Sequence, residues 1–328
     1  MIADFLELDP LAETERIASV LRSQVRDELR RKGVVVGLSG GIDSSTTAAL
    51  AVRALGAENV LGLLMPELDS SGDSIMLGQL VAATFGIRAV VEDIAPTLQA
   101  VGCYQRRDEA IRSVVPDYGA GWRSKLVVAP DSRLNISSLI VQPPGGEQRK
   151  VRLTASAYSQ IVAATNFKQR VRKMFEYYHA DRLQYAVAGT PNRLEFDQAF
   201  FVKNGDGAAD VKPIAHLYKT QVYQLAEHLG VPQEILRRPP TTDTFSMPQS
   251  QEEFYFAAPL EMLDACLYGL NNGWSPADVA ARAGLTVAQA EQTYEAIQQK
   301  RRATRYLQTP ALTIEEIHST PSTVRCHT

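Results

Sequence analysis

One stretch near the N-terminus, residues 34–45 (VVVGLSGGIDSS), constrains the fold more than any other. Its three valines predict a strand buried on both faces, and residues 46–55 with the terminal Gly56 have the pattern of a following helix. Between them, Gly40 and Gly41 allow backbone angles closed to other residues and let the main chain approach a ligand. Because free N–H groups and the dipole of a helix N-terminus favour anions, this turn suits a phosphate.

The side chains of this turn refine the interpretation. Ser39, Ser44 and Ser45 add hydroxyl donors. A Walker-type loop would have a lysine before the Ser or Thr, whereas Asp43 stands there. A carboxylate beside a phosphate repels it unless a cation lies between, so Asp43 implies Mg²⁺. Two alternatives are a turn without a ligand and the G-x-S-x-G nucleophile elbow of α/β-hydrolases, which would make Ser39 a nucleophile.

Alternation of strands and helices predicts the fold class. Residues 11–32 and 74–85 have helical patterns, and residues 60–65, 88–91 and 184–188 have the pattern of buried strands. We therefore expect an α/β fold with a doubly wound parallel sheet and ligands at the carboxyl ends of its strands. The loop 66–71 would hold a nucleotide base and ribose, or be a solvated loop.

The domain organisation is predicted from breaks in this pattern. An α/β domain over residues 1–258 is interrupted by an insertion at 103–165, with short strands at 125–128, 138–141 and 151–154. Helical patterns resume at 166–180 and 213–229. A small helical appendage at 259–307, with helices at 259–270, 276–283 and 287–306, precedes a tail at 308–328. The insertion could cover a substrate, extend an oligomer interface or be passive.

Composition excludes several functional classes. A net charge of −3 over 328 residues gives no nucleic-acid footprint, and Cys103, Cys266 and Cys326 are too far apart for a disulfide framework or a thiolate zinc site. No apolar run approaches the roughly 18 residues of a membrane span, and the N-terminus does not have the pattern of a signal peptide. We expect a cytoplasmic protein that binds neither nucleic acid nor membrane.

The turn and five later motifs, in order, resemble known families. SGGIDSS resembles the pyrophosphate-binding loop of the N-type ATP pyrophosphatases, which implies an adenine nucleotide alpha hydrolase-like, Rossmann-like fold. The later motifs resemble the ammonia-dependent NAD synthetases. NFKQR at 166–170 is similar to N-x-x-x-R, GTPNRLE at 189–195 to G-T-x-N-x-x-E, KNGDGAAD at 203–210 to K-x-G-D-G-x-A-D, and PTTD at 240–243 to P-T-A-D, while LYKTQV at 217–222 matches closely.

This resemblance implies a ligase that forms a C–N bond in two steps. ATP adenylates the nicotinate carboxylate of deamido-NAD and releases pyrophosphate, and ammonia, free or from a separate glutaminase, then attacks the acyl-adenylate. It also implies a homodimer with the dinucleotide across the interface. The alternatives are an amide ligase for a different carboxylic acid and an inactive homologue that serves as a binding subunit.

Residue roles follow from the same resemblance. Asp43 and Glu195 would hold Mg²⁺, and Glu195 also follows a predicted strand end that could face Asp43 across the sheet. Thr241 would lie beside the phosphates, and Lys203 would neutralise developing charge. The other expected ligand contacts are Gly37, Ser39, Gly40, Gly41, Ser44, Ser45 and Thr190 toward the nucleotide, Asn166 and Arg170 toward the dinucleotide, Asp206 and Asp210 near the deamido-NAD site and ammonia channel, and Lys300 in a basic segment that closes over the site or is a solvated helix end.

Overall fold

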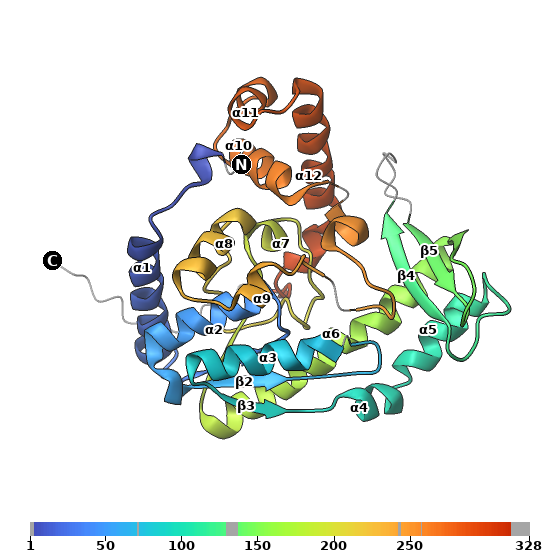
Figure 1. Ribbon diagram of the computed structural model, residues 1–328, viewed down its shortest axis with the longest axis horizontal. Coiled ribbons are helices and arrows are strands. Elements are labelled where there is room, and N and C mark those ends of the chain that lie inside the picture. Colours follow the sequence, from blue (N-terminus) through green and yellow to red (C-terminus); the bar gives the residue numbers. More distant parts are fainter. Residues whose placement is uncertain (1–2, 71, 129–136, 242–243, 257, 316–328) are drawn as a thin grey trace.

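Four parallel strands form the central sheet of the computed structural model, which describes residues 3–70, 72–128, 137–241, 244–256 and 258–315 (Figure 1). Their order is β3-β2-β1-β7, and their bounds are Val34–Gly37 (β1), Val60–Leu64 (β2), Arg88–Val91 (β3) and Ala186–Ala188 (β7). β1 pairs with β2 on one side and β7 on the other, so Val35 lies opposite both Leu61 and Val187. The predicted parallel sheet is confirmed.

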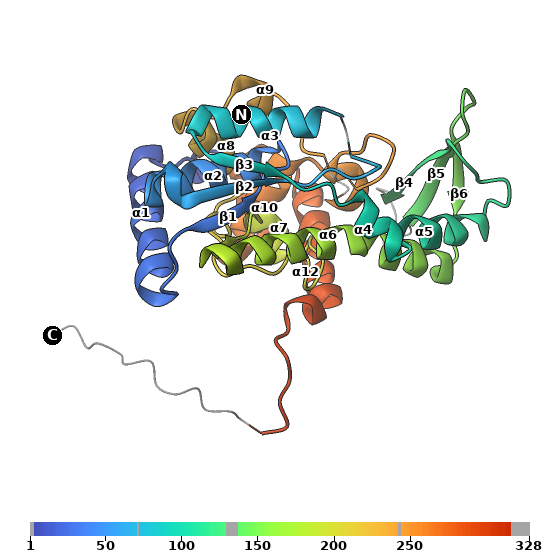
Figure 2. The ribbon, with the colours of Figure 1, turned by 90° about the horizontal axis from the view of Figure 1, so that it is seen from below.

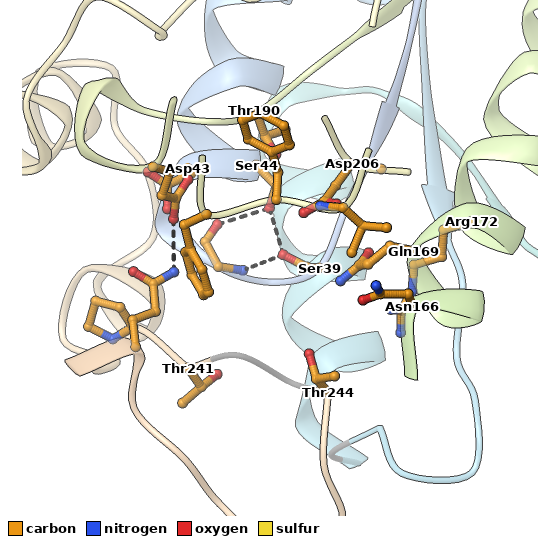
Figure 3. Close-up of a pocket in the computed structure, with 18 of the residues that line it drawn as sticks. Ser39, Asp43, Ser44, Asn166, Gln169, Arg172, Thr190, Asp206, Thr241 and Thr244 are labelled. Atoms are coloured by element: carbon orange, nitrogen blue, oxygen red, sulfur yellow. Dashed lines mark hydrogen bonds between the residues drawn. The ribbon is translucent and has the colours of Figure 1, made fainter. Parts of the chain in front are cut away.

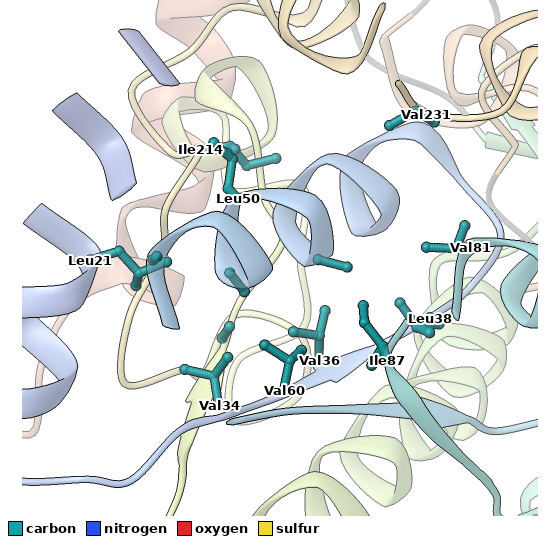
Figure 4. Close-up of a cluster of buried hydrophobic side chains, with 14 of the residues drawn as sticks. Leu21, Val34, Val36, Leu38, Leu50, Val60, Val81, Ile87, Ile214 and Val231 are labelled. Carbon is teal, nitrogen blue, oxygen red and sulfur yellow. The ribbon is translucent and has the colours of Figure 1, made fainter. Parts of the chain in front are cut away.

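Helices cover both faces of this sheet, as a doubly wound fold requires. One face packs against α1 (Pro10–Ser23), α2 (Ile42–Leu55), α3 (Gly72–Phe85) and α8 (Lys219–His228), and the other against α6 (Ala155–Leu183) (Figure 2). Alternate valines of β1 serve the two faces. Val34 and Val36 join the cluster with Leu50 in Figure 4, and Val35 joins the cluster on the α6 side.

Three helices differ from their predicted bounds for local reasons. α2 begins at Ile42, four residues early, because the glycine-rich turn leads directly into its first turn. α6 begins at Ala155, where the side chain of Thr154 accepts a hydrogen bond from Ala157 N. The predicted insertion boundary at 165 therefore falls inside a helix. α8 begins only at Lys219, although a helix was expected from residue 213.

The β excursion predicted inside the insertion is confirmed. β4 (Arg123–Val128), β5 (Ser137–Gln142) and β6 (Arg149–Arg152) form an antiparallel sheet in the order β4-β5-β6. The start of the insertion is helical, which the sequence analysis missed: α5 (Cys103–Arg112) follows α4 (Ala95–Ala100) and packs along α6. Figure 1 shows the small sheet as a separate layer beyond α5.

The C-terminal helices confirm the predicted helical segment. α10 (Leu260–Asn271), α11 (Pro276–Ala283) and α12 (Val287–Gln308) bury their apolar faces in a second cluster, which also contains Leu6, Leu194 and Tyr218. The remaining elements are α7 (Arg193–Asp197), α9 (Gln233–Leu236) and the short turns Asp4–Leu6, Gln24–Glu28, Ala57–Asn59 and Glu252–Phe256. None of the helices in the described ranges is long and apolar enough to span a bilayer. Most of the predicted tail, residues 316–328, lies outside the described residues.

Candidate active site

A cavity of about 730 Å³ opens at the carboxyl ends of β1 and β2. The β1–α2 turn forms one wall, and α6 contributes Asn166, Gln169 and Arg172 to another (Figure 3). The segment around Thr241 and Thr244 and the end of α12 complete the lining. The site thus lies where a doubly wound sheet is expected to bind its ligand.

The glycine-rich turn has lining residues and supporting residues. Gly37, Ser39, Gly41, Asp43 and Ser44 line the cavity, and their contacts with a nucleotide stay a prediction. The Ser39 and Ser44 hydroxyls lie 3.1 Å apart, and Ser39 Oγ accepts a hydrogen bond from Gly41 N at 3.3 Å. These groups leave hydroxyl and N–H donors at the start of α2, where an anion is favoured.

Gly40 and Ser45 support the turn instead of lining the cavity, which corrects their predicted role. Gly40 has a φ of +74°, and a Cβ there would lie 2.7 Å from Leu77 Cβ, so glycine permits both the turn and its contact with α3. Ser45 is fully buried, and its hydroxyl donates to Gly41 O at 2.8 Å. No histidine is among the described residues that line the cavity, so nothing there activates Ser39 as the elbow interpretation would require.

Asp43 faces a buried cation that the sequence analysis did not assign to the site. Lys219, the first residue of α8, forms an ion pair with Asp43 Oδ2, and Asn192 Nδ2 donates to Asp43 Oδ1 at 3.0 Å. Lys219 is 2% exposed and lines the cavity beside Glu195. The LYKTQV motif contained this lysine, but it lies 176 residues from Asp43 in the sequence, and only the packing of α8 against α2 brings the two together.

Glu195 completes a pair of carboxylates around this cation. Its Oε1 accepts from Gln251 Nε2 at 2.9 Å, and its Oε2 accepts from Asn192 N at 3.3 Å in the capping box of α7. Burial, followed by the negative charge of Asp43, raises the pKa of Glu195 to about 8. The described residues contain no group of three or more His, Cys, Asp or Glu side chains arranged for a metal. Two carboxylates that repel each other at the wall of a phosphate-sized cavity nevertheless fit Mg²⁺, which is commonly bound by one or two carboxylates with the remaining ligands from phosphate and water.

The residues predicted to contact deamido-NAD do not all lie at the cavity. Asn166, Arg170 and Asp206 line it, as do Thr190 and Lys203, which were given other roles. The Lys203 ammonium, however, donates to the carbonyls at the end of α12, Tyr306 O at 3.0 Å and Thr309 O at 2.8 Å.

The side chains of Asp206 and Asp210 both accept hydrogen bonds from backbone N–H groups. Asp206 Oδ1 accepts from Val202 N at 2.8 Å, and burial raises the pKa of this carboxyl. Asp210 does not line the cavity. Its Oδ2 accepts from Val187 N on β7 at 2.7 Å, because it satisfies an N–H at the edge of the sheet. Asp210 therefore supports β7 from outside the cavity, and its predicted place near the deamido-NAD site stays a prediction.

Lys300 is likewise not at the cavity. It is buried against the 255–256 turn, with its ammonium 4.4 Å from the centroid of the Tyr255 ring, and burial lowers its pKa to about 8. It is neither the predicted ligand contact nor a solvated helix end. The last turns of α12 do reach the cavity, through Thr304, Tyr306 and Leu307.

The remaining motif residues are placed as follows. Thr241 lines the cavity and forms a β-bridge with Ser250, while residues 242–243 of the PTTD motif lie outside the described residues. The loop 66–71 is not simply solvated: Lys168, which has no exposed surface, binds Glu67 Oε1 at 2.9 Å and Asp69 Oδ2 at 2.6 Å. Pro66 and Ser70 of this loop do line the cavity.

Comparison with known proteins agrees with this geometry. The family model of NAD synthase matches residues 13–117 and 146–307. The chain is 63% identical over 308 residues to an NH(3)-dependent NAD(+) synthetase of Rhizobium meliloti (strain 1021), covering 93% of this chain and 92% of that one. It is 64% identical over 314 residues to the protein of that name from Mesorhizobium japonicum, covering 94% and 98%.

Solved structures agree with the fold. An NMN synthetase from Francisella tularensis matches with a TM-score of 0.65 at 22% identity, covering 94% of this chain and 99% of that one. An NH3-dependent NAD synthetase from Campylobacter jejuni matches with a TM-score of 0.63 at 20% identity, covering 94% and 100%. At these identities the likeness concerns the fold alone, whereas the family match covers most of the chain. On the family match and its identity to these relatives, the chain belongs to the NAD synthase family.

Proposed function

We propose that this protein makes NAD from deamido-NAD, ATP and ammonia. A carboxylate oxygen of the nicotinate group attacks the α-phosphorus of ATP, and the bond to pyrophosphate breaks. Ammonia then attacks the carbonyl carbon of the acyl-adenylate, loses a proton, and AMP leaves. The observation that carries the proposal is the glycine-rich turn with Asp43 and Lys219 in one cavity of a chain of this family.

The residues around the turn are suited to position and neutralise phosphate groups, which is most of what phosphoryl-type transfer requires from a protein. Gly41 N and the hydroxyls of Ser39 and Ser44 would bind phosphate oxygens at the start of α2. Lys219 would contribute a positive charge from α8. This cation takes the part that a lysine within the loop plays in Walker-type proteins.

Mg²⁺ is part of the proposal. Asp43 and Glu195 would hold the ion, and bound Mg²⁺ would offset the charge of the triphosphate and of the leaving pyrophosphate. Lys219 would then shift from Asp43 toward the phosphates, because the metal would satisfy the carboxylate. A homodimer stays a prediction from the resemblance, and a cytoplasmic location stays a prediction from the composition and the N-terminal sequence.

The experiment is an assay of pyrophosphate release with ATP, Mg²⁺, deamido-NAD and ammonium, with the product identified by mass. NAD formation supports the proposal. Pyrophosphate release only with another acid, for example nicotinate mononucleotide in place of deamido-NAD, would assign the activity to a different carboxylate. Neither product in a folded protein that binds ATP would refute the proposed ligase activity.

Variants test the residues. Asp43→Asn and Glu195→Gln are expected to lower pyrophosphate release by at least 100-fold while the chain stays folded by circular dichroism, because both side chains serve a cation at the cavity wall. Asp210→Asn is a matched control, since this acid accepts a hydrogen bond from Val187 N of β7 and does not line the cavity. Wild-type turnover in either site variant would contradict the metal assignment.

A further inference from the structure

One side of the cavity is formed by residues 244–256, which we call the closing segment. Thr244, Gln251, Phe254 and Tyr255 of this segment line the cavity. Gln251 also donates to Glu195 Oε1 at 2.9 Å, and both side chains are buried. The position of the closing segment therefore determines the surroundings of a proposed metal ligand.

The closing segment is hydrogen-bonded to the insertion. Ser124 N on β4 donates to Ser246 Oγ at 2.9 Å, and Met247 N donates to Ser124 O at 3.3 Å. The side-chain amide of Gln249 donates to Leu126 O. β4 is an edge strand of its sheet, so these contacts use backbone groups on the edge that β5 leaves free.

A charged contact adds to this pairing. The Lys125 ammonium lies 2.7 and 2.9 Å from the two carboxylate oxygens of Glu253 and donates to Pro248 O at 3.3 Å. The side chains of Lys125 and Glu253 are 12% and 40% exposed. Because the Lys125 side chain is mostly shielded from water and binds both Pro248 and Glu253, the contact restrains the closing segment more than an ordinary surface ion pair would.

Apolar packing fixes the beginning of the segment. Phe245 is 5% exposed and belongs to the core cluster of the insertion, with Tyr118, Leu126 and Ile161. Phe254 packs against the same cluster and also lines the cavity. The small sheet therefore has a packed core that is shared with the closing segment.

From these contacts we propose that the insertion is a positioning device for the active site: β4 holds the closing segment in place, with Lys125 as its main positioning residue. The family model leaves out residues 118–145, which contain all of β4. In this protein, a strand outside the matched family regions thus fixes a segment that lines the cavity and holds Glu195. The sequence left open whether the insertion covers a substrate, extends an oligomer interface or is passive. The proposed role is nearest to a cover, but the insertion acts on the site through the closing segment.

The inference about catalysis rests on the proposed function, so the experiment has one readout that does not. Hydrogen exchange of the full-length Lys125→Ala variant is compared with wild type. We expect exchange within residues 246–254 to be about tenfold faster, and the KM for Mg·ATP to rise about three- to tenfold with little change in kcat or melting temperature. Lys125→Arg should restore both readouts.

Arg149→Ala is the matched control. Arg149 on β6 forms an ion pair of 2.9 Å with Asp117 in the same insertion, and among the described residues it makes no hydrogen bond or ion pair with the closing segment. Ser246→Ala removes the acceptor of Ser124 N and gives a second test if Lys125→Ala does not fold. The control should change neither exchange in the segment nor KM.

The outcomes separate the two proposals. Unchanged exchange in both Lys125→Ala and Ser246→Ala would overturn the anchoring role of β4. Faster exchange with an unchanged KM for Mg·ATP would overturn its positioning role while leaving the anchor. If wild-type protein makes no NAD, the proposed function fails, and faster exchange in the variants still supports the anchor.

Discussion

Asp264 allows a sharp prediction, because this buried carboxylate links the C-terminal helices to Lys219. It lies on α10 with no exposed surface, and its Oδ2 accepts from Thr220 N at 2.7 Å, next to Lys219 in the first turn of α8. Its Oδ1 has no hydrogen-bond partner among the described residues. Burial raises the pKa of Asp264 to about 7, although the backbone N–H groups of Thr220 and Lys219 partly oppose the shift.

The sign of the effect on stability follows from this pKa. The ordinary pKa of an aspartate is 3.8, so between about pH 4 and 7 the folded protein keeps a proton that the unfolded chain loses. The free energy of unfolding therefore falls as the pH rises through this range. Between pH 5 and pH 8 the wild-type protein crosses about two pKa units of this shift, so its free energy of unfolding falls by at most about 3 kcal/mol.

Asp264→Asn tests this reasoning because it keeps an acceptor oxygen for Thr220 N and removes the charge. We expect the variant to gain up to about 3 kcal/mol relative to wild type on going from pH 5 to pH 8, measured by urea unfolding at both values. A constant difference between the two proteins would refute a buried charge at this site. Asp264→Ala, which also loses the acceptor, should lower kcat/KM because the first turn of α8 then holds Lys219 less well.

Two further predictions concern buried lysines. Lys300→Met should leave the KM for ATP within about twofold of wild type. In the wild type, the free energy of unfolding should rise between about pH 8 and 10.5, because the folded state favours the neutral amine in that range, and the variant should lose this rise. A large loss of ATP affinity in the variant would instead show that Lys300 contacts the ligand. Lys168→Met should lower the free energy of unfolding by about 3–5 kcal/mol at pH 7, since Glu67 loses its cation and Asp69 keeps only Arg107, and a loss below about 1 kcal/mol by urea unfolding would contradict that pairing.

The sheet could be predicted because its strands are short, apolar and separated by helices. The three valines of β1 lie between two neighbours, as their continuous burial required. Helix boundaries were less predictable where the sequence pattern of one element lies directly beside that of the next. The start of α6 at Ala155 was missed because the alternating residues of β6 end only three positions earlier, and α5 was missed because it directly precedes turn-rich sequence.

The site residues that could be predicted are those that lie in a recognisable local sequence motif. The turn from Gly37 to Ser44 carries its own signal, and Glu195 follows β7, which pairs with β1. Lys300 shows a signal that was overlooked. Ala290, Thr293, Ile297 and Lys300 have helical spacing and are all buried, so the lysine belongs to the inward face of α12 and not to a basic surface.

Buried ion pairs are the part of the site that local sequence does not encode. Lys168 on α6 pairs with Glu67, and Lys219 on α8 pairs with Asp43, in each case with a partner far away in the sequence. Lys173 differs, because it pairs with Glu176 within α6. A buried ion pair is weak evidence for stability, because well-packed apolar residues often serve equally well. Of the three lysines, Lys219 alone lines the cavity. We infer that Lys168 fixes α6 to the loop 66–71 and that Lys173 acts within its own helix, whereas the Asp43–Lys219 pair is placed to exchange its partner when a phosphate enters.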